Sequence, residues 1–543
     1  MLAFISAIGI CSFLGIPYGP VHTSLPFLLM GIGVDDMFVI MACKNQLTQE
    51  EKKASIPVQM GLALKQAGVS ITITSMTDVV ASVIGGTTIL PALESFCLYA
   101  AVGVMMTFIY QSTFFVAFVA IDENRMLQSR NGIICCYKHK DYTPMKCSRQ
   151  NYTRDFLHWV YTNIILAKVG KALVILITIF FASFGTYGTL NLKQKFDKKW
   201  VLAQDSYFLK YLNEREKYYP MMGQNAGVYF GKLNYSEELQ NIHHLTQQLR
   251  NETDILQDVE SWLDKFKKYV NHNFDRGLPY EVLSDEDFRY YLGKFLHSPS
   301  GAHIDFNYKF FSDDSQRSVA AMNRVKSVVS AANFTTGDGF STVWAQAFAN
   351  WVTDEVIHRE LFRNLVLALV CVMATTTILI LDVNICFWLL ICVLLTLVNT
   401  CGFMHFWGLT IDVVSCIALV LAIGLCVDYA AHVGHTFLYV TGTRQERALE
   451  AVLSVGAAVV NGGLSTLVSM SMLFFCATYI FQTFFKIFSL VVLFGLFHGV
   501  VFLPVILSLI GSKSHVKEDV KVKTEPVNTI LLYETSEKKD IIR

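Results

Sequence analysis

Long uninterrupted runs of apolar residues are the feature that most limits how this chain can fold. A transmembrane helix needs about 20 such residues to cross the hydrocarbon core of a bilayer. Of the 543 residues, 53% are hydrophobic and only 16% are charged, whereas an ordinary soluble domain carries about 25% charged residues. Ten apolar segments can be read from the sequence: 1–17, 22–43, 69–90, 95–120, 169–190, 362–381, 384–405, 410–438, 450–477 and 482–511. The pattern predicts a multi-pass α-helical membrane protein of the plasma membrane or an endomembrane.

Polar stretches divide the apolar segments into parts of different composition. All 13 cysteines lie outside residues 191–361, so this polar block has no disulfides and must fold around its own hydrophobic core. Residues 121–168 carry eight Lys or Arg against four Asp or Glu. The predicted parts are a first membrane region with about four helices at 1–120, a basic linker at 121–168, a membrane helix at 169–190, an outer α+β domain at 191–361, a five-helix membrane bundle at 362–511 and a charged tail at 512–543.

The polar block has the sequence pattern of a mixed α+β domain. Ser206–Tyr219 and Ser236–Arg250 are predicted helices, the second opening with Ser and two Glu as an N-cap signal. Ala226–Leu233 and Ile304–Phe310 are predicted strands. The amphipathic stretch Thr342–Leu361 is predicted to be a helix that leads into the next membrane segment.

The distribution of Lys and Arg in the short connections predicts the orientation of the chain, because cytoplasmic loops are enriched in these residues. The 44–68 and 439–449 connections contain Lys or Arg. The short connections of the opposite side contain neither residue: 18–21, 91–94, 406–409 and 478–481. The linker and the tail are therefore predicted to be cytoplasmic, and the 191–361 domain to be extracellular or lumenal.

Glycosylation motifs agree with this orientation. Asn234, Asn251 and Asn333 each begin an Asn-x-Ser/Thr motif within the outer block. Such motifs are used only on the extracellular or lumenal side of a membrane. A fourth motif begins at Asn151 in the predicted cytoplasmic linker, and it is expected to stay unmodified.

The chain also repeats itself. Phe13-Leu-Gly-Ile16 and Phe406-Trp-Gly-Leu409 are alike, and in each case an Asp follows the glycine after 20 residues, at Asp35 and Asp428. A short basic loop, a helix with central Ser or Thr and a Phe-rich helix follow each Asp. The pattern predicts a parallel internal repeat with two matching membrane halves.

The two predicted halves differ in size. The second half has six predicted membrane helices, one before the outer block and five after it, whereas the first half has four. By symmetry, the first half is expected to lack two helices, an outer domain between them and the start of a third. The sequence is therefore predicted to be part of a longer chain, from an incomplete gene model or a short isoform, with further coding sequence upstream of Met1.

Acidic residues lie in the middle of predicted membrane helices. Asp35 and Asp36 are adjacent, and Asp428 occupies the equivalent place in the second half. A charged Asp at the bilayer centre costs ~2.5–3.5 kcal/mol, and adjacent carboxylates repel each other, so one of them favours its protonated form. His432 lies four residues after Asp428 on the same helix face and could exchange a proton with it. Asp35, Asp36, Asp428 and His432 are therefore predicted to form a relay for protons or sodium ions.

Polar and small residues accompany these acids. The next helix of each half carries secondary polar candidates: Asp78, Thr77, Ser465 and Thr466. Glycines recur nearby at Gly31, Gly33, Gly424, Gly462 and Gly463. Small residues let membrane helices approach closely, so packing and helix sliding both account for the glycines. A buried structural hydrogen-bond network is the alternative for the acids, and the recurrence of Asp in both halves favours ion coupling.

The motifs and charges of the chain also exclude several functions. There is no Gly-x4-Gly-Lys-Ser/Thr loop for ATP and no His-Glu-x-x-His motif. Intramembrane aspartyl proteases use Gly-x-Gly-Asp, whereas Gly31-Ile-Gly-Val-Asp35 is one residue longer. The net charge is 0, so no overall basic field favours nucleic acid. No enzymatic activity, no cofactor and no metal site is predicted. The sequence leaves the oligomeric state open.

Several of these motifs resemble those of one membrane protein family. Gly33-Val-Asp-Asp-Met-Phe38, Ile73-Thr-Ser-Met-Thr-Asp78 and Val427-Asp-Tyr429 are similar to motifs of the Patched-related branch of the resistance–nodulation–division (RND) superfamily. Phe196-Asp-Lys-Lys-Trp200 and Val259-Glu-Ser-Trp-Leu263 are similar to segments of the second outer domain in Patched domain-containing proteins. The resemblance covers nearly the whole chain.

This resemblance implies a fold and a function. It implies a twelve-helix plan with two α+β outer domains and a sterol-sensing domain, of which residues 1–120 match a part. It also implies movement or sensing of sterols or other lipids, driven by a coupling cation at Asp35, Asp36 and Asp428. The leading interpretation is an ion-driven lipid permease. The alternatives are a non-transporting, sterol-responsive receptor that acts through cytoplasmic partners and a scaffold at membrane contacts.

Overall fold

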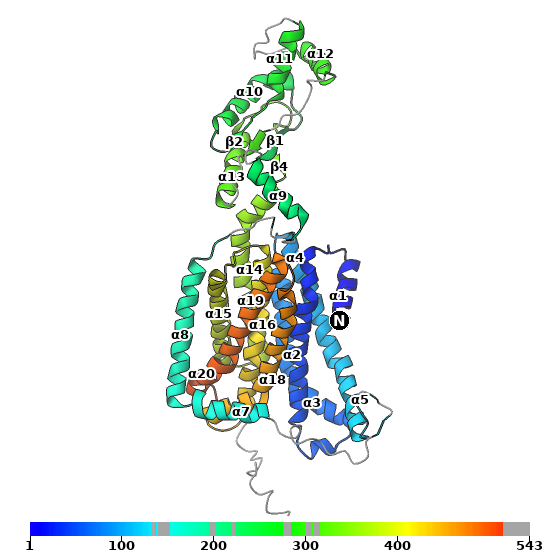
Figure 1. Ribbon diagram of the computed structural model, residues 1–543, viewed down its shortest axis with the longest axis vertical. Coiled ribbons are helices and arrows are strands. Elements are labelled where there is room, and N and C mark those ends of the chain that lie inside the picture. The colour runs from blue at the N-terminus through cyan, green and yellow to red at the C-terminus, as the bar shows by residue number, and fades with distance from the viewer. Residues whose placement is uncertain are drawn as a thin grey trace, which may run out of the picture.

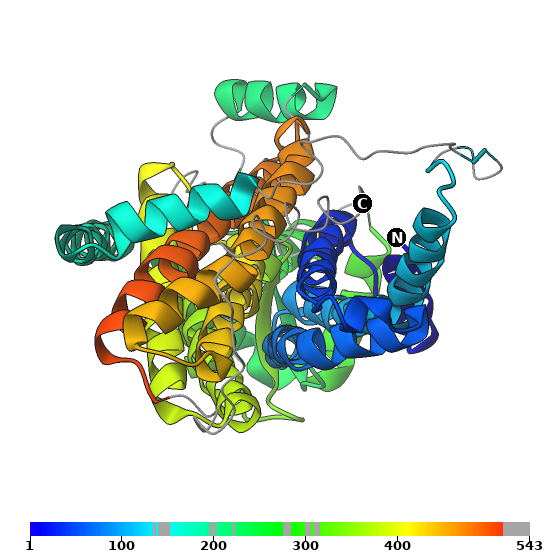
Figure 2. The same ribbon diagram turned by 90° about the horizontal axis from the view of Figure 1, so that it is seen from below.

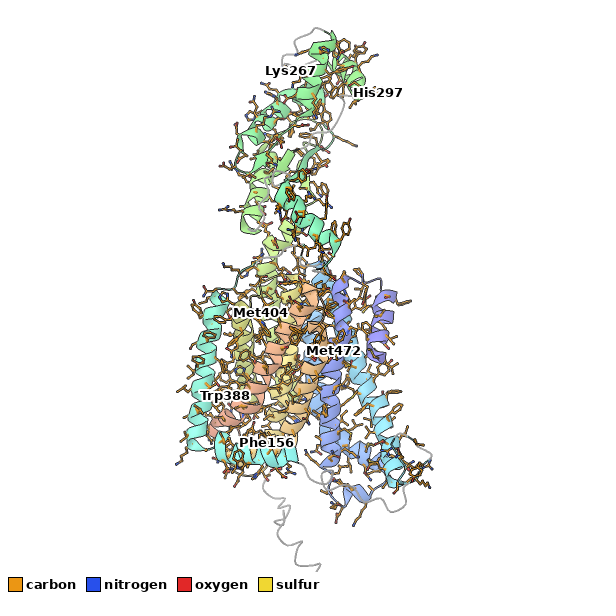
Figure 3. The ribbon with its side chains drawn as sticks, viewed as in Figure 1. Phe156, Lys267, His297, Trp388, Met404 and Met472 are labelled. Atoms are coloured by element: carbon orange, nitrogen blue, oxygen red, sulfur yellow. The ribbon has the colours of Figure 1, made fainter. Side chains whose placement is uncertain are left out.

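The computed structural model contains a bundle of long helices and a smaller domain that projects from one end of it (Figure 1). The structure describes residues 1–132, 134, 137–138, 152–194, 199, 202, 205–219, 223–274, 284–298, 306–308 and 315–513. The Asn151 motif and the tail beyond residue 513 lie outside the described residues. The linker helix α7 (Tyr152–Val160), with Phe156, lies across the end of the bundle opposite the projecting domain (Figure 3).

Nine helices within the described ranges are long and apolar enough to cross a membrane, and the apolar helix α1 (Leu2–Phe13) is shorter. They are α2 (Leu25–Asn45), α3 (Ile56–Gly85), α4 with α5 (Pro91–Tyr110 and Val116–Leu127), α8 (Lys168–Leu190), α14 (Phe348–Ile380), α15 (Val383–Phe406), α16 (Val413–Tyr439), α17 with α18 (Arg444–Ala451 and Ala457–Phe474) and α19 with α20 (Tyr479–Leu496 and Leu503–Ile510). The prediction of a multi-pass α-helical membrane protein is confirmed.

The helix α3 extends well beyond the start of its predicted range. The apolar segment at 69–90 belongs to α3, which begins at Ile56 and ends at Gly85. Ser55 is extended at the N-cap, and Pro57 lies in the first turn, where its missing N–H has no helical partner to lose. Residues 56–68 mix polar and apolar side chains, so hydropathy alone does not show that they continue the same helix.

The two predicted halves are joined by helix pairs at the centre of the bundle. α16 is buried along almost its whole length and lies near the middle (Figure 1). α2 packs on α18, and α3 packs on α16. Seen from below, the blue first-half helices lie beside the yellow to red second-half helices (Figure 2). Each of these two pairs therefore takes one helix from each half.

Matching turns end α1 and α15. Gly15 and Gly408 adopt positive φ angles of 75° and 72°. In each turn the glycine N–H bonds the carbonyl three residues earlier, and the next N–H bonds the carbonyl five residues earlier. This is the Schellman arrangement, in which a residue with a Cβ would be strained. The internal repeat stays a prediction, and the equality of these two turns supports it.

The projecting domain is built from helices packed on one antiparallel sheet with the strand order β2-β3-β1-β4. Its elements are α9 (Tyr207–Tyr218), β1 (Gln224–Phe230), α10 (Tyr235–Asn251), β2 (Leu256–Gln257), α11 (Trp262–Phe274), α12 (Asp285–Leu296), β3 (Phe306–Tyr308), α13 (Ser315–Ala331) and β4 (Ser341–Ala345). Val228 of β1 lies opposite Val343 of β4. Both belong to a core that also contains Phe266 of α11 and Val325 of α13.

Most elements of this domain lie where the sequence predicts them. α9, α10, β1 and β3 fall within or close to the predicted ranges. The prediction of a continuous helix over Thr342–Leu361 is wrong at its start, because residues 341–345 form β4 and the helix begins at Phe348. Val343 and Ala345 are buried and Trp344 is exposed, which is the two-residue period of a strand. The N-cap of α10 is Asn234 rather than Ser236.

A buried carboxylate fixes the loop between α13 and β4. Glu238 of α10 is 1% exposed, and its Oε1 accepts the backbone N–H groups of Thr335 (2.8 Å) and Thr336 (2.9 Å). Burial opposes ionisation, but the hydrogen bonds from Asn241, Thr335 and Thr336 outweigh it and lower the pKa of Glu238. This carboxylate therefore stabilises the domain above its unfolded pKa of about 4.3, and the contribution is lost as the pH falls through the lower folded pKa.

Replacing Glu238 by Gln is expected to loosen this loop at neutral pH. The charge of the acceptor is lost, and the oxygen that accepts from Asn241 is replaced by an NH2 group that cannot accept, at a local cost of about 1–2 kcal/mol. The amides of Thr335 and Thr336 should then exchange with deuterium roughly 5–30 times faster than in the wild type. The difference should shrink in acid, where the wild-type carboxylate is protonated. The exposed Glu286→Gln variant is the control, and equal exchange in Glu238→Gln and Glu286→Gln at pH 7 would contradict this assignment.

Candidate functional site

Four buried carboxyl groups meet between three membrane helices. Asp35 and Asp36 lie on α2, Asp78 on α3 and Asp428 on α16, and each is 4–5% exposed. Asp428 lies within electrostatic range of the other three acids. The structure thus brings Asp35, Asp36 and Asp428 together and adds Asp78, which the sequence offered only as a secondary candidate.

The four acids differ in their hydrogen bonds. Asp36 accepts bonds from the hydroxyl groups of Thr74 (3.2 Å) and Ser75 (3.3 Å) on α3. The carboxyl groups of Asp78 and Asp428 lie within electrostatic range of each other. Two ionised carboxylates at this separation would repel each other, so a proton on one of the two groups stabilises the pair.

Several carboxyl oxygens of the cluster have no hydrogen-bond partner among the described residues. Within the described part of the chain, one carboxyl oxygen of Asp35, one of Asp78 and one of Asp428 have no hydrogen-bond partner. No Lys or Arg of that part forms an ion pair with any of the four acids. Four ionised Asp residues at membrane depth would cost roughly 10–14 kcal/mol on insertion scales, before their mutual repulsion is counted. The cluster therefore requires bound protons or a bound cation.

Two glycines create the space for the acids. A Cβ at Gly462 of α18 would collide with the carboxylate of Asp35, and a Cβ at Gly424 of α16 would collide with that of Asp78. Each carboxylate therefore lies directly against the backbone of a helix from the other half. The glycines at these two positions act in packing, which is one of the two roles that the sequence left open.

Two contacts between the halves correspond in position but differ in the side chain that faces the glycine. Gly31 of α2 faces Thr466 of α18, and Gly424 of α16 faces Asp78 of α3. Gly31 lies four residues before Asp35, as Gly424 does before Asp428. Thr466 thus occupies the place in the second half that Asp78 occupies in the first. The first half supplies three acids to the cluster and the second half supplies one.

His432 is held by α3 rather than by the acids. Its Nδ1 lies 2.5 Å from the hydroxyl of Ser70, and its Nε2 has no hydrogen-bond partner within the described residues. No hydrogen bond joins His432 to Asp428 there, although both lie on α16. The predicted direct exchange of a proton between them is therefore not seen in this conformation.

The other secondary candidates bond to their own helices. The hydroxyl of Thr77 donates to the Thr74 carbonyl (2.8 Å), and those of Ser465 (2.7 Å) and Thr466 (3.0 Å) donate to the Gly462 carbonyl. Thr466 also lies against Gly31 of α2, the helix that carries Asp35 and Asp36. Within the described residues, no three His, Cys, Asp or Glu side chains converge as ligands of one metal ion, so a cation at the four acids would need a different arrangement from this one.

Thr74, Ser75 and Ser70 were not selected from the sequence as site residues. Their spacing in the sequence could have indicated them. Thr74 and Asp78 are four residues apart, as are Ser70 and Thr74, so Ser70, Thr74 and Asp78 share one face of α3. That face turns toward α2 and α16 and therefore toward every acid. A search for polar residues at this spacing around Asp78 would have found them.

Helices that bury acidic residues at membrane depth, beneath a projecting domain, define a polytopic membrane protein of the RND type. The chain belongs to the MMPL family, whose model matches residues 228–529. The model of the sterol-sensing domain of SREBP cleavage-activation matches residues 1–139. The predicted relationship to the Patched-related branch of the RND superfamily is confirmed.

Curated relatives cover most of this chain. NPC intracellular cholesterol transporter 1 homolog 1b from Drosophila melanogaster is 26% identical over 90% of this chain and 46% of its own length. NPC1-like intracellular cholesterol transporter 1 from Homo sapiens is 26% identical over 94% of this chain and 45% of its own. Patched-related protein 9 from Caenorhabditis elegans is 23% identical over 94% and 60%. The chain spans about half the length of the curated relatives it matches.

Solved structures show the same fold at low sequence identity. The hedgehog release protein Disp from the water bear Hypsibius dujardini has a TM-score of 0.65 at 12% identity, covering 94% of this chain and 66% of that one. SecDF, a translocon-associated membrane protein from Thermus thermophilus, has a TM-score of 0.52 at 12% identity, covering 93% and 56%. These two likenesses concern the fold alone.

Proposed function

We propose that this protein moves sterols or other lipids within the membrane and couples that movement to an ion gradient. The acid cluster of Asp35, Asp36, Asp78 and Asp428 is the observation that carries the proposal. Buried acids without a basic partner exchange protons or cations when their surroundings change. The match to a sterol-sensing domain and the names of the cholesterol transporter relatives support a sterol or a related lipid as the substrate.

The proposed coupling step is the loss and uptake of one proton by the pair formed by Asp78 of α3 and Asp428 of α16. These two carboxyl groups lie within electrostatic range of each other. Loss of that proton leaves two adjacent negative charges, which repel and favour separation of α3 from α16. Uptake of a proton or a cation restores the pair. The alternation of these two arrangements is the proposed source of motion for lipid transfer.

Reconstitution in vesicles tests the proposal. The intact protein is placed in proteoliposomes containing a fluorescent sterol, and its movement is followed with a proton gradient, with a sodium gradient and with neither. Faster movement with one gradient supports the proposal and identifies the ion. Saturable sterol binding with no gradient dependence would instead favour the receptor function, in which residues 1–139 sense sterol without moving it.

Glycosylation tests the proposed orientation. We expect Asn234, Asn251 and Asn333 to carry glycans and Asn151 to carry none. Asn251 and Asn333 are exposed, whereas Asn234 is half-buried and its side chain bonds Glu237 (2.6 Å), so Asn234 should be occupied least. Each Asn→Gln variant is compared by gel shift before and after glycosidase treatment. A shift that depends on Asn151 alone would reverse the orientation.

A further inference from the structure

One uninterrupted helix joins the outer domain to the membrane bundle. α14 has 33 residues, which corresponds to about 50 Å at 1.5 Å per residue. Phe348 near its start lies in the outer-domain core, and Ala368 and Val372 lie in the membrane core. Figure 1 shows the helix entering the bundle directly beneath the outer domain. A continuous helix packed at both ends transmits displacement between them.

Where α14 enters the bundle, its side chains hold the turn that connects α3 to α4. Glu360, which is 5% exposed, accepts hydrogen bonds from the Thr88 hydroxyl (2.8 Å) and the Ile89 backbone N–H (3.3 Å). Arg363 pairs with Glu360 (2.7 Å) and donates to the Thr87 carbonyl (3.0 Å). Two charged side chains one helical turn apart therefore bind three successive residues of one short turn.

The same turn is rigidly connected to the acid cluster. It follows Gly85, the last residue of α3, and α3 carries Asp78 two turns earlier. α14 packs on α3 in addition to holding the turn. A Cβ at Gly85 would meet the Cys97 sulfur of α4 at 2.6 Å and Val420 of α16 at 2.9 Å, so this end of α3 has no free space around it.

We propose that Glu360, with Arg363, is a positioning residue that couples the outer domain to the acid cluster. The interaction ties α14 to the end of α3, so a shift of α3 at Asp78 displaces α14 and with it the outer domain. The role of this coupling in transport rests on the proposed function. The coupling of α3 to the outer domain can be measured without lipid movement. Neither residue touches the acids, so their effect is exerted through α3.

Distances between the two parts of the protein test this link. Spin labels on genetically encoded non-natural residues are placed at Leu190, at the outer end of α8, and at Tyr229 of β1, both of which are exposed. The distance distribution is measured by double electron–electron resonance in the intact protein and in Asp78→Asn, which removes the titrating charge. We expect Asp78→Asn to shift the distribution and Glu360→Gln to abolish that shift.

Matched variants separate coupling from folding. Arg359→Gln changes an exposed charge on the same helix and should retain the full Asp78→Asn shift. Thr88→Val removes one hydrogen bond to Glu360 without leaving a buried charge unpaired, and it should reduce the shift even if Glu360→Gln folds poorly. A full shift in folded Glu360→Gln or in Thr88→Val would overturn the proposal.

The lipid assay distinguishes this inference from the proposed function. If Asp78→Asn stops ion-driven lipid movement but leaves the distances unchanged, the coupling through Glu360 is wrong and the proposed function stands. If the distances shift as expected but the wild type moves no lipid under either gradient, the coupling stands and the proposed function is wrong.

Discussion

Replacing Asp428 by Asn is expected to reduce ion-driven lipid movement to the level of protein-free vesicles while the fold is retained. The amide has nearly the size of the carboxyl group, so the contact with Asp78 on α3 can persist. It does not titrate, however, so the alternation between a protonated pair and two repelling charges is lost. The measurement is the rate of fluorescent sterol transfer in proteoliposomes under the gradient that drives the wild type.

The same loss is expected for Asn at Asp35, Asp36 or Asp78, because the four groups form one site. Ser465→Ala is the matched control, since within the described part of the chain the Ser465 hydroxyl bonds its own helix alone, at the Gly462 carbonyl. It should transport lipid as the wild type does. Unchanged rates and unchanged dependence on pH or sodium in all four Asn variants would show that the acids are structural.

Replacing Gly402 by Ala is expected to destabilise the membrane bundle strongly. Gly402 of α15 lies against the backbone of Gly185 on α8, and Gly188 lies against the backbone of Gly402. A methyl group at Gly402 would meet backbone atoms that cannot rotate away, so the two helices must separate. Overpacking of this kind costs up to about 3 kcal/mol, which corresponds to a fall of roughly 3 °C in the apparent Tm of a protein of 543 residues.

A second glycine provides the control for this experiment. A Cβ at the exposed Gly61 of α3 would meet no atom within 4 Å, and Ala is favoured over Gly inside a helix by about 1 kcal/mol. Gly61→Ala should therefore leave Tm unchanged or raise it slightly. Equal Tm values for Gly402→Ala and Gly61→Ala would show that α8 and α15 are not in backbone contact.

Hydropathy predicted most of the membrane helices. It failed for segments whose residue composition does not reveal whether they form a helix or a strand. The membrane helices are visible as apolar runs, but the first 13 residues of α3 are not, because they lie in a helix of mixed composition at the edge of the bundle. Residues 341–345 have both helical and strand periodicity, and only pairing with β1 decides between them. The contact of Gly185 with Gly402 joins segments more than 200 residues apart, which a single sequence does not reveal.

The acid cluster was predictable in part, for a physical reason. An Asp within an apolar run is costly, so Asp35, Asp36 and Asp428 stand out in the sequence. Asp78 also lies in such a run, but its place in the acid cluster depends on the packing of α3 against α16. That packing brings Asp78 close to Asp428. The same packing places His432 against Ser70. The four-residue spacing of His432 from Asp428 had instead suggested a direct contact between those two side chains.

Infrared titration of the carboxyl groups tests most directly whether the four acids act as one site. The intensity of the protonated-carboxyl band of the purified protein is followed over a range of pH in the wild type and in each Asp→Asn variant. Because coupled groups share their titration, each single replacement should move the midpoint of the band that remains. If each replacement removes its own share of the band and leaves the other midpoints unchanged, the acids titrate independently and the proposed ion-coupling site does not exist.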